Sequence, residues 1–105
     1  MQNLPPDRLG VIFSALADPT RRAILARLAR GPASVKDLAA PFDITPQAVS
    51  RHLGGLEAAG LIARAPLAQW RPCALVPDPL GEAAGWLEDC LRAWQEGRPR
   101  RGDGS

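Results

Sequence analysis

Imidazole and thiol groups bind metal ions such as zinc, and thiols carry redox chemistry. The sequence has three of them: the single histidine, His52, and the two cysteines, Cys73 and Cys90. A tetrahedral metal site needs several such ligands close together. One cysteine in each of two separate elements does not make a site of this kind, so we expect no metal and no other cofactor. A thiol switch stays open as an alternative, because it needs only two exposed, acidic sulfurs within reach of each other.

The positions of the two cysteines favour packing over reactivity. Cys73 lies two residues before Leu75 in a segment with the pattern of a strand, so the two side chains share one face. Cys90 lies beside the apolar positions of the last helical segment. Buried cysteines with a structural role are the commoner case. We therefore expect both thiols to pack inside the protein.

A second group of side chains, in the stretch TPQAVSRH, could read a nucleic acid. Gln47, Ser50 and Arg51 lie on one face of a helix with 3.6 residues per turn. Glutamine pairs with the edge of adenine and arginine with that of guanine, while Thr45 and Ser50 suit a phosphate or either base. His52 lies at the edge of this face. Two interpretations of it stay open: a DNA contact, or a histidine packed beside the core with a hydrogen-bond partner.

The helix that must hold these groups has clear ends and an apolar inner face. Thr45 is a good N-cap and Pro46 suits the first helical position. Gly60 is the expected left-handed residue after the helix, and the next residues return the chain to the core. The inward positions are Val49, Leu53, Leu56, Ala48 and Ala59. A short helix and a tight turn come before it, which is the form of a helix-turn-helix whose second helix enters the major groove by its N-terminal end.

The remaining segments predict a mainly α fold with one small β-hairpin. Asp18 caps a helix whose apolar stripe is Ala23, Ile24 and Leu28. Pro41 ends the short third helix, which begins at Ser34 with the pattern of a capping box. In all we expect five helices, at 8–16, 19–30, 34–40, 46–59 and 79–97, and two strands, at 61–65 and 69–76.

Charge is segregated along the chain, although the net charge is only +2 at pH 7. Residues 19–73 hold eight basic and three acidic side chains, a net of +5, whereas residues 78–96 hold one basic and five acidic, a net of −4. A basic middle suggests a half that binds a polyanion. At 105 residues the chain is one domain, for which a dimer adds apolar burial. It shows neither a signal peptide nor a membrane span, so we expect a cytoplasmic protein.

The order of these elements, with a two-stranded wing after the fourth helix, is the winged helix-turn-helix plan. Over residues 12–96 the sequence closely resembles the ArsR/SmtB family of small bacterial transcriptional repressors. The blocks that carry the resemblance are LADPTRRAIL, SVKDLA, QAVSRHLGGLEAAGLI and RPCALVPDPL, followed by WL. The first and third blocks together are highly specific.

The resemblance implies a homodimer, formed mainly by the first and last helices, on a palindromic operator in double-stranded DNA. It also implies a repressor that an unidentified small-molecule or redox signal releases. Carried over to this sequence, the DNA-binding residues are Thr45, Pro46, Gln47, Ser50, Arg51, His52, Arg64 and Arg71. The dimer-interface residues are Leu9, Ile12, Phe13, Leu80, Leu87, Leu91 and Trp94.

Two departures from the family pattern bear on DNA binding. Gly54 and Gly55 stand where family members often carry a basic residue. They lower helix stability by about 1 kcal/mol each and remove a phosphate contact. The wing tip, APLAQ, is apolar where the family often has arginine and glycine. Contact by the wing then rests on Arg64, Gln69 and Arg71.

Other functions fit the sequence less well. The cysteine pairs and the carboxylate and histidine ligands of metal-sensing members are missing from the third and last helices, so the sequence resembles members without a metal site. One histidine and no nucleophile or phosphate-loop motif argue against an enzyme. A winged helix used only for protein contact would carry an apolar or acidic face at 45–52, where this one is polar and basic. We expect an N-terminal arm at 1–7, the winged domain at 8–96 and a disordered basic tail at 97–105.

Overall fold

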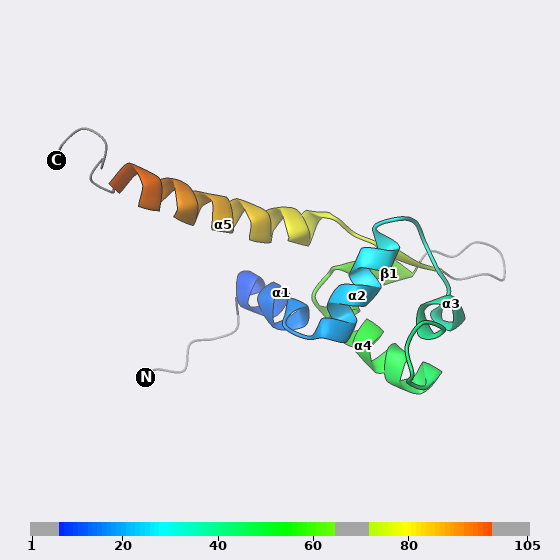
Figure 1. Cartoon of the computed structure of the whole chain (residues 1–105). Helices are drawn as coiled ribbons and strands as arrows, with labels where there is room; N and C mark the ends of the chain where they lie inside the picture. The colour runs from blue at the N-terminus through cyan, green and yellow to red at the C-terminus, as the bar shows by residue number, and fades with distance from the viewer. Residues whose placement is uncertain (1–6, 65–71, 98–105) are drawn as a thin grey trace, which may run out of the picture.

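The computed structural model describes residues 7–64 and 72–97, and it has the expected five helices and two-stranded hairpin. Figure 1 shows α5 along one side of the molecule and α4 on the other, with α1 and α2 between them. The helices are α1 Arg8–Leu16, α2 Pro19–Leu28, α3 Val35–Ala39, α4 Pro46–Ala58 and α5 Asp78–Gly97. The strands are β1 Ile62–Arg64 and β2 Cys73–Leu75. The predicted fold class is confirmed.

Short polar side chains start four of the helices, three of them as predicted. Asp18, Ser34 and Thr45 each accept a hydrogen bond from the backbone N–H three residues later, at 2.9 to 3.1 Å. This satisfies one of the N–H groups that have no partner in the first turn. Asp7 does the same for α1 through Gly10 N at 2.7 Å. Asp7 is the last residue of the expected N-terminal arm, and α1 begins at Arg8 as expected.

The core lies where α2, α3, α4 and the hairpin meet. Val49, Leu53 and Leu56 of α4 are fully buried in it, as their spacing predicted. On α2 the buried residues are Ile24, Leu25 and Leu28, whereas Ala23 is exposed. The predicted stripe was therefore wrong at Ala23. Successive helical residues are about 100° apart, so residues 24, 25 and 28 share one side of α2 and residue 23 points away from it.

The hairpin is antiparallel and is joined to the segment before α3. Ile62 pairs with Leu75, and Arg64 with Cys73. Cys73 also exchanges two backbone hydrogen bonds with Ala33, at 2.8 and 3.1 Å. Its thiol is buried in the core, as expected. The wing tip and Pro66 lie outside the described residues.

Gly60 makes the turn from α4 into the hairpin. Its φ of 75° lies in the left-handed region that glycine adopts without strain. The N–H of Gly60 bonds to Glu57 O and that of Leu61 to Leu56 O, both at 3.0 Å. This arrangement closes the end of the helix and sends Leu61 and Ile62 into the core. The predicted helix end is confirmed.

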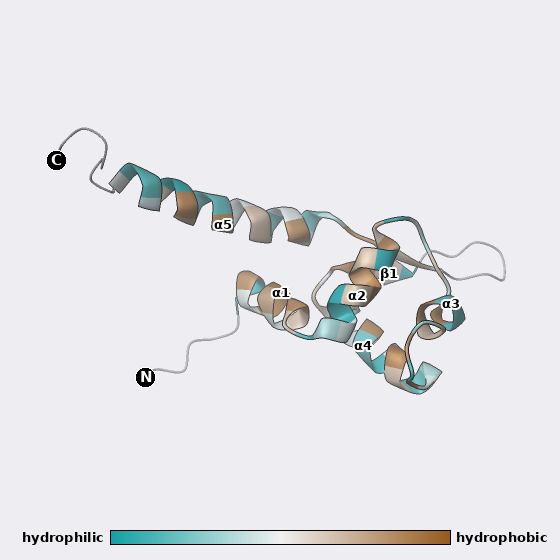
Figure 2. Ribbon diagram, viewed as in Figure 1, coloured by the Kyte–Doolittle hydropathy of each residue, from teal (hydrophilic) through white to brown (hydrophobic). Residues whose placement is uncertain are grey.

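Helix α5 packs against α1 and leaves most of its surface open. Phe13 meets Trp86 edge to face, with ring centroids 6.0 Å apart, and Arg8 pairs with Glu82 at 2.6 Å. Figure 2 shows apolar and polar positions alternating along α5. The large exposed apolar residues of α5 are Trp86, Leu87, Leu91 and Trp94. Gly97, which the sequence analysis placed at the end of the last helix and at the start of the tail, is the last residue of α5.

Within the described residues no helix is both long and apolar enough to span a lipid bilayer.

Candidate nucleic-acid interface

Helix α4 presents a polar face opposite its buried one. Gln47, Ser50 and Arg51 are exposed, and so is Gly54 on the same side. Since the inner face is fixed in the core, the outer side chains have defined positions on a rigid support. Hydrogen-bonding groups held on such a helix can reach base edges in a major groove.

The N-terminal end of α4 is exposed at the edge of this polar face. Thr45 and Pro46 are exposed, but the Thr45 hydroxyl already accepts from Ala48 N at 3.1 Å. Its first role here is therefore to hold the helix start. The free N–H groups of the first turn and the helix dipole still favour a negatively charged group at this end, such as a DNA phosphate.

His52 packs against the start of α2. Its Nδ1 lies 3.5 Å from Asp18 Oδ2, and only 27% of its side chain is exposed. The pKa of Asp18 lies below its usual value, mainly because the Arg21 backbone N–H bonds to the carboxylate and also because of the nearby His52. This geometry favours the packed interpretation of His52, which links α4 to α2. A DNA contact by His52 stays a prediction.

Arg21 is a candidate DNA-binding residue that the sequence analysis missed. It comes from α2, yet it lines a surface hollow with Ala48, Arg51 and His52 of α4. The hollow thus has an arginine on each side. Nothing in the local sequence marks Arg21 above the other arginines of α2, because only the packing of α2 on α4 brings it there.

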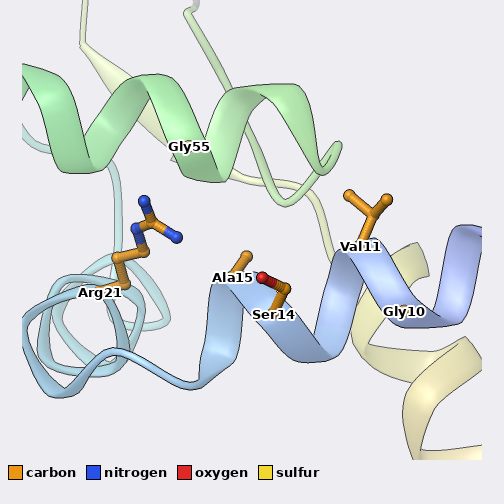
Figure 3. A pocket seen from close by; sticks show the side chains of 6 residues that line it. All are labelled: Gly10, Val11, Ser14, Ala15, Arg21 and Gly55. Atoms are coloured by element: carbon orange, nitrogen blue, oxygen red, sulfur yellow. The ribbon is translucent and has the colours of Figure 1, made fainter. Parts of the chain in front are cut away.

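Gly55 makes room for this arginine. A Cβ built on Gly55 would lie 2.5 Å from one terminal nitrogen of Arg21 and 2.6 Å from its Cζ, whereas a Cβ on Gly54 would meet nothing within 4 Å. Figure 3 shows the Arg21 guanidinium extended toward α4 at this point. The packing of Arg21 therefore explains why position 55 is a glycine. No contact explains Gly54, which leaves the outer face of α4 without a side chain at that position.

The other arginines of the basic middle have different roles. Arg22 donates to Leu16 O at 2.8 Å and to Ala17 O at 3.0 Å, at the end of α1, and Arg27 donates to Gly31 O at 3.1 Å. These are hydrogen bonds at helix ends, which stabilise the fold. Both guanidinium groups keep their positive charge, so they still add to the positive field of residues 19–73.

The wing residues are only partly described. Arg64 is half-buried, and its Nε is shielded from solvent without a hydrogen-bond partner. Gln69 and Arg71 lie outside the described residues. Contact between the wing and DNA therefore stays a prediction.

The two thiols differ strongly in environment. Cys73 is buried, and burial raises the pKa of its thiol. Cys90 is exposed on α5, so its expected burial is wrong for the single chain. A switch that needs two exposed, acidic thiols is disfavoured by Cys73. No group of three or more potential metal ligands occurs among the described residues.

This difference predicts unequal reactivity with a thiol reagent. In the native protein Cys73 should react at least about a hundredfold more slowly than Cys90, because it becomes accessible only through local opening. Absorbance of a released aromatic thiolate measures both rates. Cys90→Ser should remove the fast phase and Cys73→Ser should keep it; a fast phase that survives Cys90→Ser contradicts the burial of Cys73.

Comparison with known proteins agrees with this geometry. A helix-turn-helix domain family matches residues 16–65. The HTH-type transcriptional regulator Rv2034 of Mycobacterium tuberculosis is 46% identical over 79 residues, which are 75% of this chain and 69% of that protein. The transcriptional repressor SdpR of Bacillus subtilis is 33% identical over 76 residues, 72% of this chain and 84% of SdpR.

Solved structures of ArsR regulators share the fold. The crystal structure of one ArsR family transcriptional regulator is 42% identical, with a TM-score of 0.79, and the match covers 88% of this chain and all of that one. The chain belongs to the ArsR family of DNA-binding transcriptional regulators. A homodimeric winged helix-turn-helix DNA-binding domain from Mycobacterium bovis shares the fold at 20% identity, with a TM-score of 0.66 over 90% of this chain and 89% of that one. The described helices and hairpin of this ArsR chain are therefore a winged helix-turn-helix.

Proposed function

We propose that this ArsR chain is a homodimeric repressor that reads a palindromic operator with α4. The observation that carries the proposal is the outer face of α4: Gln47, Ser50 and Arg51 are exposed on a helix whose opposite side is fully buried. The two arginines of the neighbouring hollow, Arg21 and Arg51, supply positive charge for the DNA backbone. Because such DNA lies in the cytoplasm of bacteria, this function places the protein there.

The dimer is proposed from the open face of α5. Leu87, Leu91 and Trp94 are 47%, 58% and 60% exposed, and they follow one another at helical spacing. A chain of this size gains stability by covering such a stripe. Beside it, Leu9 and Phe13 of α1 are half-buried. The domain from Mycobacterium bovis is a homodimer, and a second copy of this chain would cover both α1 and α5.

Two residues that were predicted to lie in the dimer interface, Ile12 and Leu80, pack within their own chain. Ile12 is fully buried inside its own chain, so its side chain has no surface left for a partner. Its assignment to the interface was wrong. Leu80 is partly buried against the core cluster. The interface we propose is therefore centred on Leu87, Leu91 and Trp94.

Release from DNA by a signal is the second part of the proposal. SdpR is a repressor by name, and a repressor needs a way to leave its operator. A redox signal through the two cysteines is disfavoured because Cys73 is buried. A small-molecule signal requires a binding site of its own.

The test of DNA reading is a binding selection from randomised duplexes, followed by affinity measurements on the selected site. Arg51→Ala should cost roughly 1–3 kcal/mol of specific binding if Arg51 contacts a base. The loss would be uniform across sequences, with a shallower salt dependence, if Arg51 contacts a phosphate. Fluorescence anisotropy at several salt concentrations separates the two.

Arg92→Ala is the matched control, since Arg92 is an exposed arginine of α5 that pairs with Asp89 at 2.9 Å, away from α4. It should leave the affinity unchanged. If Gln47→Ala and Arg51→Ala both bind the selected site as the unmodified protein does, in well-folded dimers, α4 does not read this DNA.

A further inference from the structure

A groove runs between α1, α2 and α4, on the side of α1 that faces away from α5. Its volume is about 410 Å³, and it is lined by Gly10, Val11, Ser14, Ala15, Arg21 and Gly55. Val11 lies two positions from Phe13, which faces Trp86, so it points to nearly the opposite side of α1. Figure 3 shows Val11, Ser14 and Ala15 rising from α1 and Arg21 from α2 toward the space beside α4.

The groove has one cation and no acid among its lining residues. Arg21 takes part in none of the close ion pairs of the described chain, but the Asp18 carboxylate lies near enough for the charge of Arg21 to help lower the pKa of Asp18. The Nε of Arg21 is shielded from water, so a ligand in the groove would have to bind the terminal nitrogens. One of these nitrogens lies beside Gly55, in the lining of the groove. The parallel N–H donors of a guanidinium favour an anion that accepts with two oxygens, as a carboxylate does.

The rest of the lining suits a short apolar body. Val11 is 38% exposed and Ala15 only 3%, so the first forms a wall and the second the floor. The Ser14 hydroxyl at the exposed side is a further hydrogen-bond donor. On the α4 side, the missing side chain of Gly55 leaves room for the Arg21 guanidinium. An apolar groove with one placed charge is the usual form of a small-molecule site.

We propose that this groove binds a small organic monocarboxylate, with its carboxylate on Arg21 and its aliphatic or aromatic body on Val11 and Ala15. Arg21 also lines the hollow beside Arg51 and His52 on the DNA-facing side of α4. A bound carboxylate neutralises the charge that Arg21 adds there, and it therefore weakens binding to DNA. This second step rests on the proposed DNA-binding function; the site itself does not.

The first experiment measures ligand binding without DNA. The full chain, labelled with ¹⁵N, is titrated with sodium hexanoate and with sodium benzoate at constant ionic strength, and hexanamide is the neutral control. We expect at least one carboxylate to shift the amide signals of Val11, Ser14, Ala15, Arg21 and Gly55 saturably, and hexanamide to leave them in place. Arg21→Gln should weaken this binding at least about tenfold. Arg30→Gln should not, because Arg30 is exposed in the turn after α2 and lies outside the groove.

The proposed site is overturned if neither carboxylate gives saturable shifts at these residues, as would happen if a partner subunit covers the groove. It is also overturned if Arg21→Gln binds as tightly as the unmodified protein. Should Arg21→Gln fail to fold, Arg21→Lys takes its place, because lysine keeps the charge but not the paired donors; it should bind more weakly than arginine.

The second experiment measures the affinity for the selected DNA site with and without the carboxylate that binds. We expect weaker DNA binding at saturating carboxylate, and no such effect in Arg21→Gln. An unchanged DNA affinity overturns the link to DNA. A chain that binds the carboxylate but selects no DNA instead refutes the proposed function and leaves the groove as a ligand site.

Discussion

Leu87→Glu is expected to convert the dimer into a monomer and to lower the affinity for a palindromic operator by about a hundredfold to ten-thousandfold. The side chain lies in the middle of the open apolar face of α5 and is 47% exposed in the single chain. A carboxylate there would have to lose its water on dimerisation without a partner charge. Two linked α4 helices bind two half-sites far more tightly than one, so separation of the subunits removes that gain.

Sedimentation velocity at micromolar concentration measures the first effect, and fluorescence anisotropy on the selected duplex the second. Ala93→Glu is the matched control, because it adds the same charge at an exposed position of α5 outside the apolar stripe. It should stay dimeric. A monomer in the unmodified protein, or a dimer of Leu87→Glu with full affinity, contradicts the proposed interface.

Leu53→Ala is expected to lower the free energy of unfolding by roughly 2–5 kcal/mol. Leu53 is fully buried in the cluster shared by α2, α3, α4 and the hairpin. Removing its outer carbon atoms takes apolar surface out of the core and leaves a cavity that the neighbouring helices fill only in part. Urea unfolding at one fixed protein concentration measures the change, since the stability of a dimer depends on concentration.

Ser50→Ala is the control on the same helix, because Ser50 is exposed on the outer face. Its effect on stability should stay within about 0.5 kcal/mol. The pair separates the two faces of α4: Leu53→Ala should reduce stability and Ser50→Ala should not. Equal stability of the two variants would show that α4 does not pack on the core by this face.

The sequence by itself determined the helix starts, the two faces of α4 and its end. A cap such as Thr45 acts on a backbone N–H three residues away, and Gly60 acts on its own φ. The inward positions of α4 follow from helical geometry, since a residue and those three and four ahead share one side. These determinants lie within one or two turns of chain, which is why the residue order alone indicates them.

The spacing of apolar residues does not predict which residues are buried where two sides of a helix are similarly apolar. On α2 the alanine Ala23 and the leucine Leu25 are both apolar, and only the position of α4 decides that Leu25 is buried. Ile12 fits an interface as well as a core by its spacing, and contact with its own chain decides for the core. The spacing of apolar residues shows that a segment is a helix with one buried side. Which side is buried depends on the elements that pack against it.

Only the tertiary structure decided which polar groups meet. Asp18 and His52 are 34 positions apart and come within 3.5 Å because α2 packs across α4. The same packing carries Arg21 to Gly55, where the missing side chain admits the guanidinium. Nothing in the local sequence indicates these pairs, because each residue is compatible with its own helix however the helices pack on each other. The hollow and the groove on the two sides of Arg21 therefore follow from the way the helices pack, and the polar face of α4 follows from the sequence.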